Sequence, residues 1–224
     1  PEHVREMGAA HVVIATGASW RRDGVGRAHS KPIAGFAGAA VYTPDDVMAG
    51  AEIRGPVVVY DDDHYYMAGV LAEKLRRDGL AVSLVTPAGE GPSSWTHNTM
   101  EFGRIQARLL ELDIAIHAGR KLVAFDGAEV EAACIYTGRP ITIACASVVA
   151  VTARLPTEDL FRALRDDAES LRTAGIKSVT AIGDALAPAT IAHAVYAGHR
   201  YARELDAPLS NEVVLFRREL GLIG

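Results

Sequence analysis

Cysteine is scarce in this chain of 224 residues, and the scarcity limits the metal chemistry that we expect. Only Cys134 and Cys145 occur. They show no CxxC spacing and no histidine cluster lies near them, so we expect no zinc or iron–sulfur site built from this chain alone. Both lie in a stretch typical of successive strands, and we expect buried structural thiols. The sequence therefore predicts no metal ligands.

Long apolar runs and an excess of positive charge are also missing. No apolar run reaches the roughly 18 to 20 residues of a membrane span, and the N-terminus lacks the basic and apolar regions of a signal peptide. Lys and Arg number 23 against 28 Asp and Glu, a formal charge of -5. No basic stripe is present to follow a phosphate backbone. We expect a cytoplasmic protein that binds neither membrane nor nucleic acid.

Hydrolytic motifs are absent as well. The chain has no G-x-S-x-G, no H-E-x-x-H and no Ser/His/Asp order that would suggest nucleophilic catalysis. His64, Tyr65 and Tyr66 beside an acidic turn, and the pair Trp95 and His97, are expected to be packing or satisfied polar residues. We therefore assign no catalytic residue within this chain.

The first half of the chain indicates a strand–helix–strand unit. Residues 11–15 read as a parallel strand buried on both faces, closed by Thr16 and Gly17. A loop covers residues 19–38, and Thr43 before Pro44 marks a helix start. A buried strand over 57–60 leads through an acidic turn into a helix over 67–77, and a strand over 80–85 follows. A further helix over 98–112 and a strand over 114–116 complete this half.

The second half changes period. The runs 121–125, 129–136 and 141–152, broken by hairpin signals, predict an antiparallel meander. A single helix is expected over 157–174 with Thr157 as its N-cap. A strand over 178–185 carries Gly183-Asp184, and a helix over 190–205 has an apolar face.

Two short segments, 13–18 and 149–154, resemble each other. Together with the Gly-Asp turn, their order along the chain is typical of a glutathione-reductase-like fold, in which such strands lie where the chain passes between two nucleotide-binding units. Glycine allows a close backbone approach at such a turn, and a strand-end carboxylate beside a helix start suits a nucleotide. Thr16, Gly17, Gly183 and Asp184 are thus candidate cofactor-binding residues. The alternative is that Gly183-Asp184 only caps the next helix.

Four stretches carry a resemblance to a known family. The chain resembles the C-terminal part of the trimethylamine, dimethylamine and histamine dehydrogenases, relatives of 2,4-dienoyl-CoA reductase, over nearly its whole length. The stretches are HVVIATGASWRRDG (11–24), TPDDVMAG (43–50), DDDHYYMAGVLAEKL (61–75) and AIGDALAPATIAHAVYAGHRYAREL (181–205). The resemblance implies an upstream (β/α)8 barrel holding FMN and a [4Fe-4S] cluster. Because the chain opens on Pro1 and not on Met, we expect it to be part of a longer protein.

The resemblance also implies a domain organisation. We expect an α/β chain in which a Rossmann-like βαβ unit plus antiparallel meander, an NAD(P)-binding-like domain over 51–154, is inserted in a partial FAD/ADP-binding-like domain over 1–50 and 155–224. The latter would hold ADP or a FAD-like nucleotide through the candidate residues named above. Its partners would be its own N-terminal barrel, an electron-transferring flavoprotein and further copies in a homo-oligomer.

The acidic turn separates the functional alternatives. Where a dinucleotide fingerprint G-x-G-x-x-G would place glycines after the strand, this chain has Asp61, Asp63 and Tyr66. Carboxylates there should repel a pyrophosphate, so we expect no NAD(P)H site. The alternative is that these residues form only a solvated turn. The expected function is part of a flavin and iron–sulfur amine dehydrogenase or N-demethylase that gives electrons to an electron-transferring flavoprotein. The alternatives are an NAD(P)H-dependent flavin oxidoreductase of the dienoyl-CoA reductase kind, or a non-catalytic nucleotide-binding or interaction module.

Overall fold

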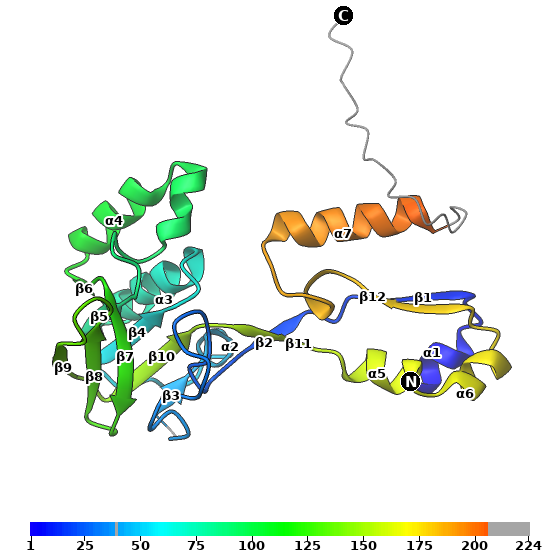
Figure 1. Ribbon diagram of the computed structural model, residues 1–224, viewed down its shortest axis with the longest axis horizontal. Helices are drawn as coiled ribbons and strands as arrows, with labels where there is room; N and C mark the ends of the chain where they lie inside the picture. Colours follow the sequence, from blue (N-terminus) through cyan, green and yellow to red (C-terminus); the bar gives the residue numbers. More distant parts are fainter. Residues whose placement is uncertain (39, 206–224) are drawn as a thin grey trace, which may run out of the picture. The chain divides into compact units, whose positions relative to one another are not determined.

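The computed structural model describes residues 1–38 and 40–205, and these divide into two compact units (Figure 1). Unit 1 combines Pro1–Thr16 with the segment that begins at Glu158, and unit 2 is Gly17–Thr157. The expected boundaries at 50/51 and 154/155 differ from these, because Ile33, Phe36 and Val47 pack into the buried clusters of unit 2. Residues 206–224 of the expected FAD/ADP-binding-like domain lie outside the described residues. No described helix has the length and apolar character to cross a membrane.

Unit 2 is built on a five-stranded parallel sheet. The strand order across it is β3 (Val41–Tyr42), β10 (Ser147–Val151), β4 (Val57–Asp61), β5 (Val82–Val85) and β6 (Ala115–His117). Every residue of β4 and β10 is buried, as expected for central strands of a parallel sheet covered on both faces. This architecture confirms the α/β class.

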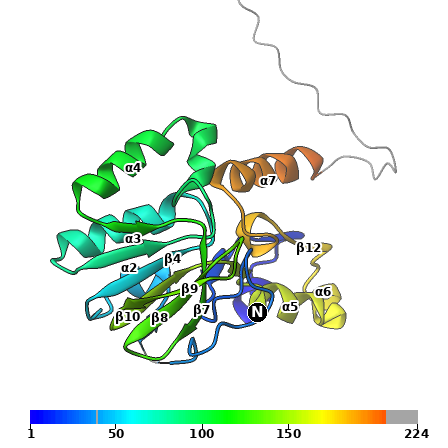
Figure 2. The same cartoon turned by 60° about the vertical axis from the view of Figure 1, so that its left-hand side comes forward.

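Helices cover one face of this sheet (Figure 2). They are α2 (Pro44–Met48), α3 (Tyr66–Arg77) and α4 (Phe102–Glu111), with the 3-10 helix η1 (Ser94–Thr99) before α4. As predicted, Thr43 caps α2: its side chain accepts from the backbone N–H of Asp46, whose carboxylate accepts in return from that of Thr43. Leu71 of α3 and Leu109 of α4 are buried in the same cluster as the sheet residues.

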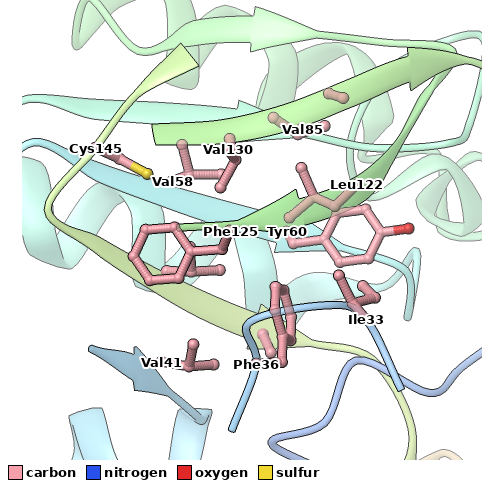
Figure 3. Close-up of a cluster of buried hydrophobic side chains, with 13 residues drawn as sticks. Ile33, Phe36, Val41, Val58, Tyr60, Val85, Leu122, Phe125, Val130 and Cys145 are labelled. Atoms are coloured by element: carbon pink, nitrogen blue, oxygen red, sulfur yellow. The ribbon is translucent and has the colours of Figure 1, made fainter. Parts of the chain in front are cut away.

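An antiparallel sheet covers the opposite face. It consists of β7 (Arg120–Phe125), β8 (Glu129–Cys134) and β9 (Pro140–Ala144). Figure 3 shows Leu122 and Phe125 beside Tyr60 of β4, with Ile33 and Phe36 approaching from the loop before β3. Gly35 lets this loop reach β7, since a Cβ at its position would lie 1.7 Å from the carbonyl oxygen of Phe125.

The prediction that residues 141–152 form one strand of the meander is wrong. The run 141–152 forms two strands, β9 in the antiparallel sheet and β10 in the parallel one. β9 alternates between exposed and partly buried residues, whereas β10 is buried throughout. A continuous apolar run hides this change of partner, because periodicity alone does not show where one strand ends.

A short antiparallel pair lies where the chain enters and leaves unit 2. β2 (Ala18–Trp20) pairs with β11 (Arg154–Pro156). The backbone N–H of Thr157 donates to the carbonyl oxygen of Gly17 at 2.9 Å. The two similar segments of the sequence, 13–18 and 149–154, each lead into one strand of this pair.

Unit 1 contains a two-stranded parallel sheet of β1 and β12. The helices α1, α5 and α6 lie beside this sheet, and the 3-10 helix η2 and α7 follow β12 along the chain. Their bounds are α1 (Glu2–Glu6), β1 (His11–Ile14), α5 (Asp159–Arg165), α6 (Ala168–Thr173), β12 (Ser178–Ala181), η2 (Gly183–Ala185) and α7 (Ile191–Glu204). Val12 and Ile14 are buried with Leu164 and Ile176.

Three expectations for unit 1 are wrong. β1 is buried on one face only, because within the described chain Val13 on the other face is 37% exposed. The single helix over 157–174 is two helices, since Asp167 leaves helical geometry and its carboxylate caps Ser170 in the first turn of α6. The N-cap of α5 is Glu158, not Thr157. α7 forms as predicted, but it buries none of its residues in the described structure.

Candidate functional site

The strand order of unit 2 reverses direction between β4 and β10. From β4 the chain moves outward to β5 and β6, and it then returns through the antiparallel sheet to β10 on the other side of β4. In open parallel sheets, ligands bind outside the carboxyl ends of the strands at such a reversal. Asp61, Asp62 and Asp63 lie at the end of β4, and Thr152 follows the end of β10. This junction of strand ends is the candidate site in unit 2.

Asp61 is fully buried and its carboxylate is used within the protein. It accepts hydrogen bonds from the backbone N–H of His64 at 2.8 Å and of Ser93 at 2.7 Å. Burial raises the pKa of Asp61 to about 7, although the two N–H donors favour the charged form. Asp61 therefore holds the segment before η1 against the end of β4.

Asp62 is also fully buried, and it binds the backbone of a distant loop. The N–H groups of Arg27 and Ala28 donate to its Oδ2 at 2.6 and 3.0 Å. Burial raises the pKa of Asp62, and these two donors oppose the rise. Gly26 passes so close that a Cβ there would lie 2.3 Å from Asp62 Oδ2. Residues 26–28, which we call the strap, thus lie against the end of β4.

Asp63 and His64 complete the turn. Burial raises the pKa of Asp63, and the charges of Arg154 and Arg27 oppose the rise. Burial and the Arg27 charge lower the pKa of His64 to about 4. The imidazole is therefore neutral at pH 7, and its 3.8 Å separation from the Asp62 carboxylate is not an ion pair.

Two arginine–tryptophan stacks flank the turn. The guanidinium of Arg27 lies 4.0 Å from the ring centroid of Trp95, and that of Arg154 lies 5.3 Å from the ring of Trp20. Cation–π contacts of this kind stabilise the side chains that form them. Trp95, expected as a packing residue, thus holds the strap.

The structure contradicts the interpretation of the acidic turn as solvated, and the expected exclusion of NAD(P)H stays a prediction. The turn is not solvated, because Asp61 and Asp62 are completely buried. Both carboxylates accept hydrogen bonds from backbone N–H groups of the protein itself. Sequence reasoning did not identify the strap as part of the site. Its only local signal was the glycine-rich character of residues 19–38.

The structure brings three of the four predicted cofactor residues together in unit 1. Thr16 follows β1, and Gly183 and Asp184 follow β12, whose neighbouring end is joined to β1 by a 3.0 Å hydrogen bond from the N–H of Ile182 to the carbonyl of Ile14. Gly183 has φ +57, a conformation that favours glycine. Gly17 follows Thr16 in the chain and is the first residue of unit 2.

Asp184 does not cap α7, whose N-cap is Thr190 and has no side-chain cap hydrogen bond, but its carboxylate is bound to the turn before that helix. Its Oδ1 accepts from the N–H of Ala189 at 3.0 Å, just before α7 begins. The carboxylate therefore orders the turn between β12 and α7. This role and contact with a nucleotide are compatible, so the cofactor assignment stays a prediction.

The two cysteines differ in environment. Cys145 is buried as expected, and burial raises its pKa to about 11. Cys134 is partly exposed, contrary to expectation, and hydrogen bonds from the Thr137 side chain and nearby backbone lower its pKa to about 7. Within residues 1–38 and 40–205, no group of three or more His, Cys, Asp or Glu side chains could hold a metal ion.

Comparison with known proteins first defines a class of domain. Residues 42–138 match the family model of the OYE-like second alpha/beta domain. This range covers most of unit 2, including the acidic turn and η1.

Comparison with individual proteins then gives particular relatives. The chain is 32% identical to dimethylamine dehydrogenase from Hyphomicrobium sp. (strain x), over 92% of this chain and 30% of that protein. The structure of histamine dehydrogenase from Rhizobium sp. 4-9 matches with 46% identity and a TM-score of 0.89, over 95% of this chain and 33% of that one. That of 6-hydroxypseudooxynicotine amine oxidase from Pseudomonas geniculata N1 matches with 38% identity and a TM-score of 0.82, over 89% and 29%.

These relatives bear out the resemblance to the amine dehydrogenases that was drawn from the sequence, and the position of this chain within such a protein stays a prediction. The chain is homologous to dimethylamine dehydrogenase and histamine dehydrogenase, and its α/β fold is similar to that of the latter. It spans about a third of the length of the relatives that it matches.

Proposed function

We propose that this chain is the nucleotide-binding-like, C-terminal portion of a flavin-dependent amine dehydrogenase or N-demethylase. The reaction is oxidative C–N cleavage of a methylated or primary amine. FMN supplies the redox chemistry in a barrel outside this chain, together with a [4Fe-4S] cluster. The observation that carries the proposal is the similarity to amine-oxidising relatives over 89 to 95% of the chain.

The acceptor that we propose is an electron-transferring flavoprotein and not a nicotinamide nucleotide. The support is the set of residues that occupy the carboxyl ends of β4 and β10. Asp61, Asp63 and Tyr66 stand where a dinucleotide fingerprint has glycines, and the strap occupies the space beside Asp62. A nicotinamide dinucleotide therefore finds neither free backbone amides nor room for its pyrophosphate.

We assign a structural ADP or FAD-like nucleotide to unit 1. The nucleotide-binding-like character of unit 1 rests on the parallel pair β1–β12 and on the Gly-Asp turn at the carboxyl end of β12. Thr16, Gly17, Gly183 and Asp184 would hold the nucleotide, because they provide a positive-φ glycine, a carboxylate and neighbouring strand ends. The nucleotide would contribute binding and order, not redox chemistry. Unit 2 corresponds to the NAD(P)-binding-like domain.

The proposed setting is a cytoplasmic homo-oligomer in which this portion packs against its own barrel. The test uses the native gene product, whose intact mass, N-terminal sequence and visible absorption spectrum are measured. We expect bound flavin with an iron–sulfur shoulder, and anaerobic bleaching of the flavin by a methylated or primary amine. Bleaching by NADPH and not by amines would instead identify an oxidoreductase of the dienoyl-CoA reductase kind. A product without flavin would identify a non-catalytic module.

A further inference from the structure

We infer that the strap, residues 26–28, is a built-in closure of the candidate site at the ends of β4 and β10, and that the Asp62 carboxylate serves as its internal anion. This deepens the proposed exclusion of nicotinamide nucleotides and rests on that proposal for its purpose. The evidence comes from the contacts of unit 2 alone. Exclusion is achieved by occupying the site, and charge repulsion is secondary.

The strap is fixed at the ends of two neighbouring strands, β4 and β10, and by Trp95 of η1. At β4, Asp62 accepts from the N–H groups of Arg27 and Ala28. At η1, the Arg27 guanidinium stacks on the Trp95 ring, and the backbone N–H of Trp95 donates to the carbonyl of His64 at 2.9 Å. At β10, the Gly26 Cβ position lies 3.2 Å from the Cβ of Thr152. The strap therefore crosses the reversal point at which a dinucleotide would bind.

The contact with Asp62 has the chemistry of phosphate binding. Successive backbone N–H groups directed at one anion are the donors with which loops hold phosphate oxygens. Here Arg27 and Ala28 direct theirs at the same carboxylate oxygen, Asp62 Oδ2. The carboxylate, supplied by the chain itself, satisfies donors that a pyrophosphate would otherwise use. An external phosphate would have to displace either Asp62 or the whole strap.

Two further observations fit a closed ligand site. Gly26 fits between Asp62 and Thr152 only because it lacks a side chain, since a Cβ would lie 2.3 Å from Asp62 Oδ2. The hydroxyl of Thr152 is buried and has no hydrogen-bond partner in the part of the chain that the structure describes. Buried polar atoms are normally paired. The orphan hydroxyl beside the strap marks a place where a polar partner is replaced by the glycine backbone.

The test opens the strap without changing the acidic turn. In Gly26→Ala, the added methyl displaces the strap from Asp62. The matched control is Gly103→Ala on α4, where a Cβ meets nothing within 4 Å. Hydrogen exchange of the Arg27 and Ala28 amides is measured by mass spectrometry, and inorganic pyrophosphate binding by calorimetry. In Gly26→Ala, we expect exchange at the strap to be at least about tenfold faster than in wild type, and pyrophosphate binding to be at least about tenfold tighter. In Gly103→Ala, we expect neither to change.

A second variant keeps the test valid if Gly26→Ala does not fold. Asp62→Asn preserves the side-chain volume but removes the anion, so it should also speed exchange at Arg27 and Ala28, whereas Asp63→Asn should not. Slow exchange at the strap in both strap variants would overturn the inference, as would equal pyrophosphate binding by wild type and Gly26→Ala. These results are independent of the amine assay. If the wild-type protein oxidises amines but the Arg27 and Ala28 amides exchange rapidly, only the closure is contradicted. If these amides are protected but amines are not oxidised, only the proposed function is contradicted.

Discussion

The buried carboxyl of Asp61 makes the stability of unit 2 depend on pH. Burial raises its pKa from 3.8 to about 7, while the N–H groups of His64 and Ser93 bind its two oxygens. Because the folded-state pKa is higher than the unfolded one, folding favours the protonated form. The stabilisation is complete below pH 3.8 and is lost as the pH rises through about 7.

The size of the effect follows from the shift in pKa. A shift of about three units at about 1.4 kcal/mol per unit corresponds to about 4 kcal/mol, of which about 3 kcal/mol falls between about pH 5 and pH 8. The lowered pKa of His64, about 4, acts in the opposite direction: stability is gained as the pH rises from about 4 to 6.5. A comparison of wild type with Asp61→Asn largely cancels the His64 contribution, because both proteins contain that histidine.

The assay is urea unfolding followed by tryptophan fluorescence. The chain has two tryptophans, Trp20 and Trp95, and both lie in unit 2, so the signal reports on that unit. At about pH 5, Asp61→Asn should be less stable than wild type by about 1 to 3 kcal/mol, because its amide group faces a backbone donor. By about pH 8 it should have gained about 3 kcal/mol relative to wild type.

The control is Asp126→Asn at an exposed carboxylate. Backbone N–H groups of Ala128 and Glu129 lower the pKa of Asp126, so it does not titrate above pH 5. Its stability difference from wild type should therefore be constant between pH 5 and pH 8. If Asp61→Asn behaved in the same flat way, or lost stability relative to wild type as the pH rose, the reasoning about burial would be refuted.

Three further predictions concern packing, capping and thiol chemistry. Thr43→Ala removes the capping box of α2 and should lower the free energy of unfolding of unit 2 by about 1 kcal/mol in urea titrations; no change would show that the cap is redundant. Leu71→Ala, at a fully buried position, should cost about 2 to 5 kcal/mol, and Val70→Ala, 58% exposed before mutation, less than about 0.5 kcal/mol in the same assay. Iodoacetamide should alkylate Cys134 with a rate midpoint near pH 7 while Cys145 stays unmodified until unfolding; equal rates at the two thiols would contradict their different burial.

Local patterns predicted the fold where one signal determined an element. Thr43 before Pro44 gave the start of α2, and the helix predicted over 67–77 matches α3 (Tyr66–Arg77) nearly to the residue. The failures occur where tertiary pairing decides. The run 141–152 divides between two sheets, and the helix expected over 157–174 is broken by the capping side chain of Asp167. Neither event leaves a distinct period in the sequence.

The same distinction applies to the sites. The proximity of Thr16 to Gly183 and Asp184 could be predicted, because the carboxyl ends of adjacent parallel strands meet at one edge of a sheet. The acidic turn was predictable because it interrupts a strand-to-helix junction. The strap was not, because its contact with Asp62 joins the Arg27 amide to a carboxylate 35 positions away, and backbone amides carry no sequence signal.

The hydrogen bond between Thr157 and Gly17 closes unit 2 into a cassette. Its first and last residues are joined at 2.9 Å, and both of its buried clusters consist only of residues between them. A segment with adjacent ends and its own core can be excised, exchanged or inserted elsewhere without stretching the chain that flanks it. We therefore expect residues 17–157 to fold when produced alone, and a short linker from 16 to 158 to replace them in the remaining chain.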